Sequence, residues 1–347
     1  MQLPDIRNAD VRGKTILLRS DIDVPLSDNG AILDDTRLQA SLPTIRFLLE
    51  HGAKVIICGK LGRPEGVDKK LSLDPVAKWY EQQFKNQNAK IKTKKIDGFE
   101  GWEITEHISL LENLQFDPKE RATDPELAKK LASLADVYVN DAFAVCHRSL
   151  ASTVGVAKLL PYFAGFRLLE ETNVLSSVLR NPNRPFVVVI GGAKIETKLP
   201  LVEKMHQLAD YVLVGGKIAG QTSELVRVQH KKLVGKKSVL LVAELNSKET
   251  DITEKSVDNF LQIINLAKTI VWNGPLGKVE EVTHATEAIA RGVVSSGAYT
   301  VVGGGDTSAF LKKIGLLHKF SFASTGGGAM LAFLSGEDLP GLSALMR

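Results

Sequence analysis

Cysteines are nearly absent from this sequence, which has only two, Cys58 and Cys146, in 347 residues and in unrelated contexts. This scarcity argues against a disulfide framework and against a cysteine-based zinc site, and it fits a reducing compartment. Long apolar runs are also missing, because no stretch approaches the roughly 18 residues of a membrane span. Residues 1–12 are too polar for a secretory signal. We therefore expect a cytoplasmic protein that does not interact with membranes.

An excess of charge of one sign is lacking as well. The net charge is only +4, and no long basic tail carries it. Nucleic-acid binding depends on a concentrated positive surface, so the sequence does not support it. Any electrostatic function must come from the local placement of charges.

Several catalytic motifs are missing. The sequence contains no G-x-x-x-x-G-K-[ST], no G-x-S-x-G and no H-E-x-x-H, so P-loop, serine-hydrolase and zinc-protease chemistry have no support. The best candidate for G-x-G-x-x-G, which begins at Gly303, lacks the third glycine and would place Asp306 against a pyrophosphate. This disfavours a dinucleotide oxidoreductase, which remains the least favoured alternative.

The chain does contain a regular alternation of strand-like and helix-like segments. Its length and 44% hydrophobic content favour two ordinary globular domains. Short β-branched runs alternate with amphipathic segments, which predicts α/β architecture with two doubly wound parallel sheets. The expected strands are 15–18, 54–58, 108–111, 137–139, 186–190, 211–214, 269–272, 299–302 and 320–323, and clear helices are 36–51, 124–134 and 198–208.

The predicted joint between the domains is a helix over residues 166–181, which Asn181-Pro182-Asn183 interrupts. It separates a first domain of residues 1–165 from a second domain of residues 182–333. Ligands of open parallel sheets lie at the carboxyl ends of the strands. The residues at the carboxyl end of each strand therefore bear most directly on function.

The strands of the first half are followed by arginine, lysine, histidine and acidic residues. Arginine side chains match carboxylate and phosphate oxygens in a two-point geometry, so this edge suits a small substrate with several negative charges. The four segments are Arg19-Ser20-Asp21-Ile22-Asp23-Val24-Pro25, Gly59-Lys60-Leu61-Gly62-Arg63-Pro64, Glu112-Asn113-Leu114-Gln115-Phe116 and Asn140-Asp141-Ala142-Phe143, the last leading to His147-Arg148.

Five strands of the second half end instead in glycine-rich turns. Glycine allows close approach of the backbone to a ligand, and N–H groups at a following helix attract phosphate. One such turn often has a purely structural reason, but five at one edge favour a polyphosphate nucleotide. The turns are Gly191-Gly192-Ala193-Lys194, Gly215-Gly216-Lys217, Asn273-Gly274-Pro275-Leu276-Gly277, Gly303-Gly304-Gly305-Asp306-Thr307 and Gly326-Gly327-Gly328-Ala329. The pattern predicts transfer between the two ligands across a cleft between the domains.

Charged residues accompany two of these turns. Asp306 beside a phosphate would be repulsive unless a cation such as Mg²⁺ lies between them. The alternative is that Asp306-Thr307 is an ordinary helix cap. Lys194 and Lys198 are four residues apart at an expected helix start, so they would share a face and neutralise phosphates. The alternative for them is a solvated basic surface.

Taken together, these motifs resemble those of the phosphoglycerate kinase family, over residues 19–341. The resemblance is weakest between residues 222 and 248, where the chain looks shorter than the family pattern. In family order the motifs are R-x-D-x-D-V-P from Arg19, D-D-T-R from Asp34, L-G-R-P from Leu61, L-L-E-N from Leu110, N-D-A-F from Asn140 with His147-Arg148, G-G-A-K from Gly191, A-K-T-I-V-W-N-G-P from Ala267, G-G-G-D-T from Gly303, S-T-G-G-G-A from Ser324 and L-P-G from Leu339.

The resemblance implies a monomeric enzyme that transfers a phosphoryl group reversibly between ATP and the carboxylate of 3-phosphoglycerate, giving ADP and 1,3-bisphosphoglycerate in glycolysis. It also implies that a tail of about residues 334–347 returns to the first domain. The acidic substrate would lie against Asp21, Asp23, Arg37, Lys60, Arg63, Gln115 and Arg148. The nucleotide would lie against Gly192, Lys194, Lys198, Gly216, Asn273, Glu280, Gly304, Gly305, Asp306 and Thr307, with Mg²⁺ nearest Asp306. Arg37, Lys194 and Lys198 would stabilise the phosphoryl group in transfer.

The sequence departs from the family pattern mainly in the acidic-substrate site. Lys60 stands in place of histidine, Gln115 in place of arginine and Asp23 in place of asparagine. Leu150 and Phe322 also replace histidines. These changes predict a substrate site more negative than that of the family. They leave open a nucleotide-binding paralogue without catalysis, or a kinase of the same fold for another small acid.

Overall fold

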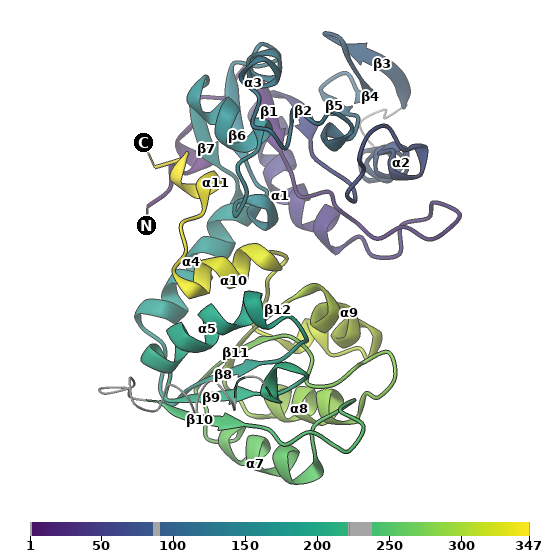
Figure 1. Cartoon of the computed structure of the whole chain (residues 1–347). Coiled ribbons are helices and arrows are strands. Elements are labelled where there is room, and N and C mark those ends of the chain that lie inside the picture. Colours follow the sequence, from purple (N-terminus) through teal and green to yellow (C-terminus); the bar gives the residue numbers. More distant parts are fainter. Residues whose placement is uncertain (1, 86–90, 221, 223–237, 347) are drawn as a thin grey trace. The chain divides into compact units, whose positions relative to one another are not determined.

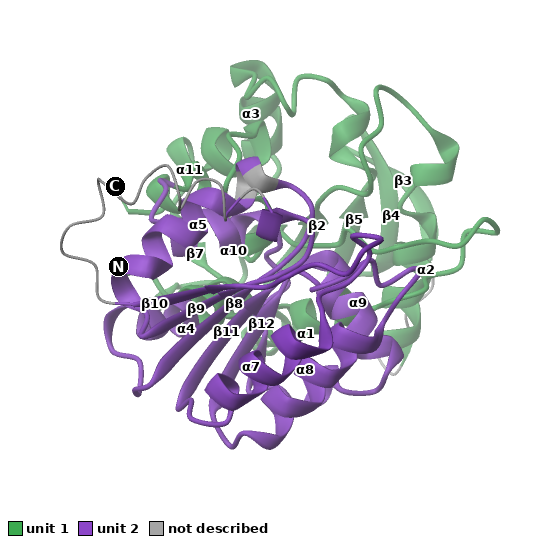
Figure 2. Cartoon of the chain, turned by 60° about the horizontal axis from the view of Figure 1, so that its bottom comes forward, with its two compact units in different colours: residues 1–172, 339–347 green, residues 173–338 purple. Residues whose placement is uncertain are grey.

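The computed structural model describes residues 2–85, 91–220, 222 and 238–346. The chain divides into two compact units, Met1–Thr172 with Leu339–Arg347 (unit 1) and Asn173–Asp338 (unit 2), which Figure 2 distinguishes by colour. The division falls inside α4 (Phe166–Arg180), within the segment that the sequence predicts as the joint. Within the described ranges, no helix is both long enough and apolar enough to cross a membrane.

Among the described residues, unit 1 is built on a seven-stranded sheet of order β3-β4-β5-β2-β1-β6-β7 (Figure 1). The pairs from β5 to β7 are all parallel, so their carboxyl ends meet at one edge. The strands are β1 (Thr15–Arg19), β2 (Lys54–Cys58), β3 (Lys92–Ile96), β4 (Phe99–Thr105), β5 (Ile108–Leu111), β6 (Val137–Asn140) and β7 (Tyr162–Ala164). The helices are α1 (Thr36–Glu50), α2 (Asp74–Gln83), α3 (Pro125–Ala132) and α11 (Pro340–Ser343). Short helical segments are η1 (Ile6–Asn8), η2 (Lys69–Leu71), η4 (Leu114–Phe116), η5 (Phe143–Val145), η6 (Ala151–Gly155) and η7 (Val156–Lys158).

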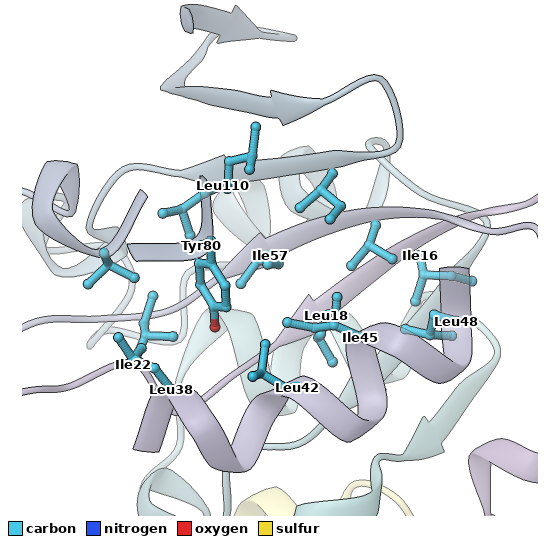
Figure 3. Close-up of a cluster of buried hydrophobic side chains, with 14 of the residues drawn as sticks. Ile16, Leu18, Ile22, Leu38, Leu42, Ile45, Leu48, Ile57, Tyr80 and Leu110 are labelled. Atoms are coloured by element: carbon cyan, nitrogen blue, oxygen red, sulfur yellow. The ribbon is translucent and has the colours of Figure 1, made fainter. Parts of the chain in front are cut away.

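The core of unit 1 forms where α1 and α2 pack on one face of the sheet (Figure 3). The apolar residues of α1 recur with helical spacing at Leu38, Leu42, Ile45 and Leu48, and all four are buried. Burial of each such side chain contributes roughly 1.5–3 kcal/mol. Tyr80 of α2 lies among them and donates or accepts a hydrogen bond with a buried serine hydroxyl of α1 at 2.8 Å. This packing holds the ends of β1 and β2 beside the start of α1.

One edge of this sheet differs from the predicted parallel arrangement. Strands β3 and β4 form an antiparallel hairpin, and β4 also pairs antiparallel with β5. The hairpin turns at Asp97 and Gly98, which both have positive φ, at 44° and 87°. An Asp-Gly pair between two strand-like runs is the signal for such a two-residue turn. The prediction of a parallel sheet was therefore wrong at this edge, and the missed signal was present in the sequence.

Unit 2 has, within its described part, a six-stranded sheet of order β10-β9-β8-β11-β12-β13 in which every pairing is parallel (Figure 1). The strands are β8 (Phe186–Ile190), β9 (Tyr211–Val214), β10 (Val239–Val242), β11 (Thr269–Asn273), β12 (Tyr299–Gly303) and β13 (Phe322–Ala323). The helices are α5 (Ile195–Leu208), α7 (Glu254–Ile264), α8 (His284–Ser295), α9 (Gly305–Lys313) and α10 (Gly328–Ser335), with the turn η8 (Leu317–Lys319).

The core of unit 2 centres on Trp272 of β11, which is fully buried. Apolar residues of α7, α8 and α9 surround one face of the sheet, including Phe260, Ile289 and Leu311. The indole N–H of Trp272 donates to the carbonyl of Gly274 at 2.8 Å. This bond links the core directly to the turn after β11, where the sequence predicts nucleotide binding.

The start of α4 is fixed by the segment after β6. Asp141 Oδ1 accepts hydrogen bonds from the backbone N–H groups of Arg167 at 2.8 Å and Leu168 at 3.2 Å. A Cβ atom at Gly165 would lie 2.4 Å from that same oxygen, so glycine is required there. Burial raises the pKa of Asp141 to about 6, although these N–H groups favour its charged form. The helix ends at Arg180, just before the predicted break.

Candidate active site

The parallel strands of unit 1 bring the predicted substrate residues to one edge. Asp21 and Asp23 follow β1, Lys60 and Arg63 follow β2, and Gln115 follows β5. Arg148 follows β6, and Arg37 lies in the first turn of α1. Residues distant in the sequence therefore gather because of the sheet topology, and the edge combines arginine and lysine side chains with two carboxylates and one amide.

Arg37 is held by a partly buried ion pair. Its Nη1 lies 2.9 Å from Asp21 Oδ1, and the Asp21 side chain is only 8% exposed. The charge of Asp21 raises the pKa of Arg37, against the effect of burial, and Asp23 and Asp34 raise it further. Asp21 Oδ2 has no hydrogen-bond partner among the described atoms. The pair fixes a permanently charged guanidinium at the end of β1.

Asp23, which replaces the asparagine of the family pattern, is also paired. Its Oδ2 accepts a hydrogen bond from Lys60 Nζ, and its Oδ1 accepts one from the N–H of Gly62 at 2.8 Å. Burial lowers the pKa of Lys60, and the charge of Asp23 opposes that shift. The two departures from the family pattern thus form one ion pair. The added carboxylate is neutralised by Lys60, which weakens the prediction of a more negative site.

Arg148 is oriented by its neighbour His147, which is not among the predicted site residues. Arg148 Nε donates to His147 Nε2 at 3.1 Å, which requires that nitrogen to be unprotonated. Burial lowers the pKa of His147, and the charges of Arg148, Lys60 and Arg63 lower it further. His147 is therefore neutral at pH 7 and acts as an acceptor. The only sequence feature that could have indicated this contact is that His147 and Arg148 are adjacent in the chain.

Gln115 is buried, being 2% exposed. Its Oε1 accepts a hydrogen bond from Arg121 Nη2 at 3.2 Å. Arg121 lies outside the motifs from which the substrate residues are predicted. Its position in the turn after η4 brings it to the same edge through the fold, and no short motif indicates that.

In unit 2 the glycine turns interlock. A Cβ atom at Gly274 would lie 2.1 Å from the carbonyl oxygen of Gly191, and one at Gly216 would lie 2.8 Å from the nitrogen of Gly192. The backbones of three neighbouring turns thus touch one another, and these glycines are required by the fold itself. The structural reading of the glycines is correct for Gly191, Gly216 and Gly274.

The glycines before and within α9 are different. Gly304 has φ 105°, and a Cβ atom there would meet nothing closer than 3.4 Å. At Gly305 it would meet nothing within 4 Å, and no positive φ requires glycine. The N-terminus of α9 therefore has open space beside it, where N–H groups attract anions. Packing therefore does not explain the glycine at position 305, and the open space leaves room for a ligand to approach the backbone.

Asp306 and Thr307 behave differently from one another in the first turn of α9. Asp306 is exposed, and its charge favours protonation of Lys198. Thr307 is fully buried, and its hydroxyl accepts a hydrogen bond from the N–H of Gly274 at 3.0 Å. The Thr307 side chain therefore joins α9 to the turn after β11. Neither side chain makes a described N-terminal cap bond in α9.

Lys198 is a buried cation of unit 2. Its Nζ donates to Asn273 Oδ1 and lies 3.5 Å from the Asn273 carbonyl oxygen. Burial lowers the pKa of Lys198 to about 8, and Asp306 opposes that shift. Lys194 is exposed and extended at the N-cap of α5, outside the helix. The two lysines therefore do not share a helical face as predicted, because only Lys198 lies in the helix.

A cavity of about 170 Å³ lies at the glycine edge of unit 2. Gly192, Gly216, Glu280 and Asp306, all predicted nucleotide residues, line it together with Pro275 and Leu276. The cavity is also lined by residues that the glycine motifs did not predict, namely Leu245, Glu249, Thr250, Asp251 and Lys278. Of these, Asp251 stabilises the start of α8, because its Oδ2 accepts a hydrogen bond from the backbone N–H of Ala285 at 3.1 Å.

The described residues include no group of three histidine, cysteine, aspartate or glutamate side chains that could hold a metal ion. A magnesium ion at Asp306 would thus take one carboxylate oxygen from the chain and its other ligands from phosphate and water. That is the usual donor set of a nucleotide-bound magnesium ion. The exposed Asp306 carboxylate beside the open N-terminus of α9 fits such an ion.

A profile of the family described as Phosphoglycerate kinase matches residues 6–248 and 225–337. A phosphoglycerate kinase of Chloroflexus aggregans is 39% identical over 399 residues, which cover 99% of each chain. Phosphoglycerate kinase 3, cytosolic, of Arabidopsis thaliana is 36% identical over 394 residues, covering 98% of this chain and 97% of that one. The solved structure of phosphoglycerate kinase from Coxiella burnetii is 31% identical and covers 99% of each chain with a TM-score of 0.83.

The alignments are longer than the 347 residues of this chain, so the relatives contain segments that it lacks. The two ranges matched by the family profile overlap at residues 225–248, within the stretch predicted to be shortened. Residues 223–237 lie outside the described part, so that prediction stays one. Profile, relatives and fold agree over nearly the whole length, and the chain therefore belongs to the phosphoglycerate kinase family, the carboxyl-acceptor phosphotransferases of glycolysis.

Proposed function

We propose that unit 1 binds 3-phosphoglycerate, that unit 2 binds ATP or ADP, and that the chain transfers the terminal phosphoryl group reversibly between ATP and the substrate carboxylate. The observation that carries this proposal is the contrast between the two edges. The edge of unit 1 presents arginines from several loops, which suits an acidic small molecule. The edge of unit 2 presents open backbone at Gly305 beside the buried Lys198, which suits a polyphosphate.

The proposed reaction needs little covalent chemistry from the protein. The attacking carboxylate of 3-phosphoglycerate is already ionised at pH 7, so no general base is required. Catalysis then consists of positioning and of stabilising the negative charge on the phosphoryl group. We assign that stabilisation to Arg37, Lys194 and Lys198. The hydrogen bond from Lys198 Nζ to Asn273 Oδ1 fixes the position of the ammonium group at the end of β11.

The expected domain limits are part of this proposal. Residues 1–165 with the tail of about 334–347 would form the substrate domain, and residues 182–333 the nucleotide domain, with residues 166–181 as the hinge. We also propose a monomer, as the resemblance to the family implies. We further propose a cytoplasmic location, consistent with the cytosolic relative in Arabidopsis thaliana.

The direct test is turnover with 3-phosphoglycerate, ATP and magnesium, followed as ADP release in a coupled assay. We expect saturable turnover that requires all three components. Nucleotide binding without turnover would indicate a non-catalytic paralogue. Turnover that required another hydroxy-acid or phospho-acid, found in a panel of such acids, would instead indicate a kinase of the same fold with a different substrate.

Mg²⁺, when bound, would supply positive charge that offsets the negative charge of the nucleotide phosphates. Asp306 is the acidic side chain that would hold it, and Asp306→Asn removes that charge with little change in shape. We expect this variant to need at least tenfold more magnesium for half-maximal nucleotide binding, which a calorimetric titration of ADP at several magnesium concentrations measures. Asp258→Asn, the same change at an exposed carboxylate of α7, serves as the matched control. An unaltered magnesium dependence in Asp306→Asn would leave Asp306 with only a structural role in α9.

A further inference from the structure

Position 115 is where the acidic-substrate site departs most from the family pattern, because an uncharged amide replaces an arginine. Gln115 lies in η4, directly after the end of β5, and is 2% exposed. Its Nε2 is buried and has no hydrogen-bond partner among the described residues. Its Oε1 accepts from Arg121 Nη2 at 3.2 Å. The amide is therefore oriented by Arg121, and both N–H donors of its NH₂ group have no described partner.

Arg121 is held at this edge by a second contact. Its Nη2 also donates to the carbonyl oxygen of Pro64, the residue after Arg63. Both acceptors are uncharged, so neither neutralises the guanidinium. The fork of an arginine has five N–H donors, and these two bonds use one nitrogen. The remaining donors stay available to a ligand with several oxygens.

Three guanidiniums from separate loops interact electrostatically at this edge. Burial lowers the pKa of Arg148, and the positive charges of Arg63 and Arg121 lower it further, against the effect of Asp23. Lys60 contributes less positive charge to this edge than the arginines do, because its Nζ forms an ion pair with Asp23. Like charges that interact in this way are unfavourable unless an anion binds among them. The arrangement is the one expected of a site for a phosphate or carboxylate.

We infer that Arg121 provides the guanidinium that position 115 lacks, binding the acidic substrate directly, and that Gln115 is the residue that positions it. This inference rests on the proposed binding of 3-phosphoglycerate to unit 1. It replaces the prediction of a weakened, more negative site. In this chain the positive charge is carried by residue 121 and not by residue 115, and the Gln115 amide holds the Arg121 guanidinium in place through a hydrogen bond.

The first test is Arg121→Gln, with binding of 3-phosphoglycerate measured by calorimetry and rates by the coupled assay. Loss of one charge-assisted hydrogen bond should weaken binding about 10- to 100-fold. KM should rise by a similar factor while kcat changes little, because the contact is made before and during transfer. Lys119→Gln is the matched control, since it removes one exposed charge of the same segment whose partner is Asp124 at 3.9 Å. That control should bind the substrate as the wild type does.

The second test places the positive charge at position 115, where the family pattern has arginine. Gln115→Arg in the Arg121→Gln background should restore most of the lost affinity. The same Gln115→Arg change alone should not tighten binding, because it would place a guanidinium at hydrogen-bonding distance from Arg121. Equal 3-phosphoglycerate binding in Arg121→Gln and Lys119→Gln, or tighter binding in Gln115→Arg alone, would overturn the inference. A wild type that binds no 3-phosphoglycerate would overturn the proposed function instead, so the two failures can be distinguished.

Discussion

Replacement of Arg37 by methionine should lower kcat about 100- to 1,000-fold, the loss typical when one donor to a developing negative charge is removed. The KM for 3-phosphoglycerate should change much less. The reason is geometric, because the Asp21 carboxylate 2.9 Å away holds the guanidinium in place before the substrate arrives. Because the Arg37 guanidinium is already oriented, it need not rearrange when the phosphoryl group is transferred. Steady-state rates over a range of 3-phosphoglycerate concentrations separate the two parameters.

Two variants control that experiment. Arg37→Lys keeps a cation beside the buried Asp21, so it should fold as the wild type does and lose less activity than Arg37→Met. Arg63→Met removes an exposed guanidinium of the same edge and should mainly raise KM. If Arg37→Met changed KM alone, Arg37 would serve the ground state and not the transferring group.

Much of the fold could be predicted because strands and helices leave strong local patterns. The runs at residues 54–58, 108–111, 186–190 and 211–214 are strands with the predicted limits. Fully buried parallel strands are continuous in β-branched residues, which makes them easy to recognise. The failure at the sheet edge has a physical reason of the same kind. β3 is a lysine-rich strand with little burial, so its pattern resembles that of a loop, and only Asp97-Gly98 indicates the hairpin.

The location of the candidate site could be predicted where a residue belongs to a motif next to a strand end. Gly216 and Asp306 were predicted in that way, and both line the cavity of unit 2. Two contacts of the site could not be predicted from the sequence. The pairing of Lys60 with Asp23 depends on the approach of two loops, so the sequence shows two separate changes where the structure has one ion pair. Arg121 reaches the edge only through the turn after η4, and its contact with Gln115 has no sequence signal.

Glycines posed the remaining question, because a sequence does not say whether the fold or a ligand requires each one. Gly274 has φ 96°, and a Cβ atom there would lie 2.1 Å from a backbone oxygen that cannot move away easily. Gly274→Ala should therefore destabilise unit 2 by roughly 3 kcal/mol or more. This corresponds to a fall of roughly 6–12 °C in the unfolding midpoint of a unit of this size. Differential scanning calorimetry without ligands measures it.

Gly305→Ala makes the opposite prediction and provides the matched control. A methyl group at Gly305 meets open space in the structure, and alanine favours the helix that begins there. The variant should be at least as stable as the wild type, yet it should bind ADP with magnesium more weakly, since the methyl group would occupy the approach to the N–H groups of α9. Wild-type stability in Gly274→Ala would show that the turns can separate. Wild-type ADP affinity in Gly305→Ala would place the phosphates away from α9 and remove that helix from the proposed nucleotide site.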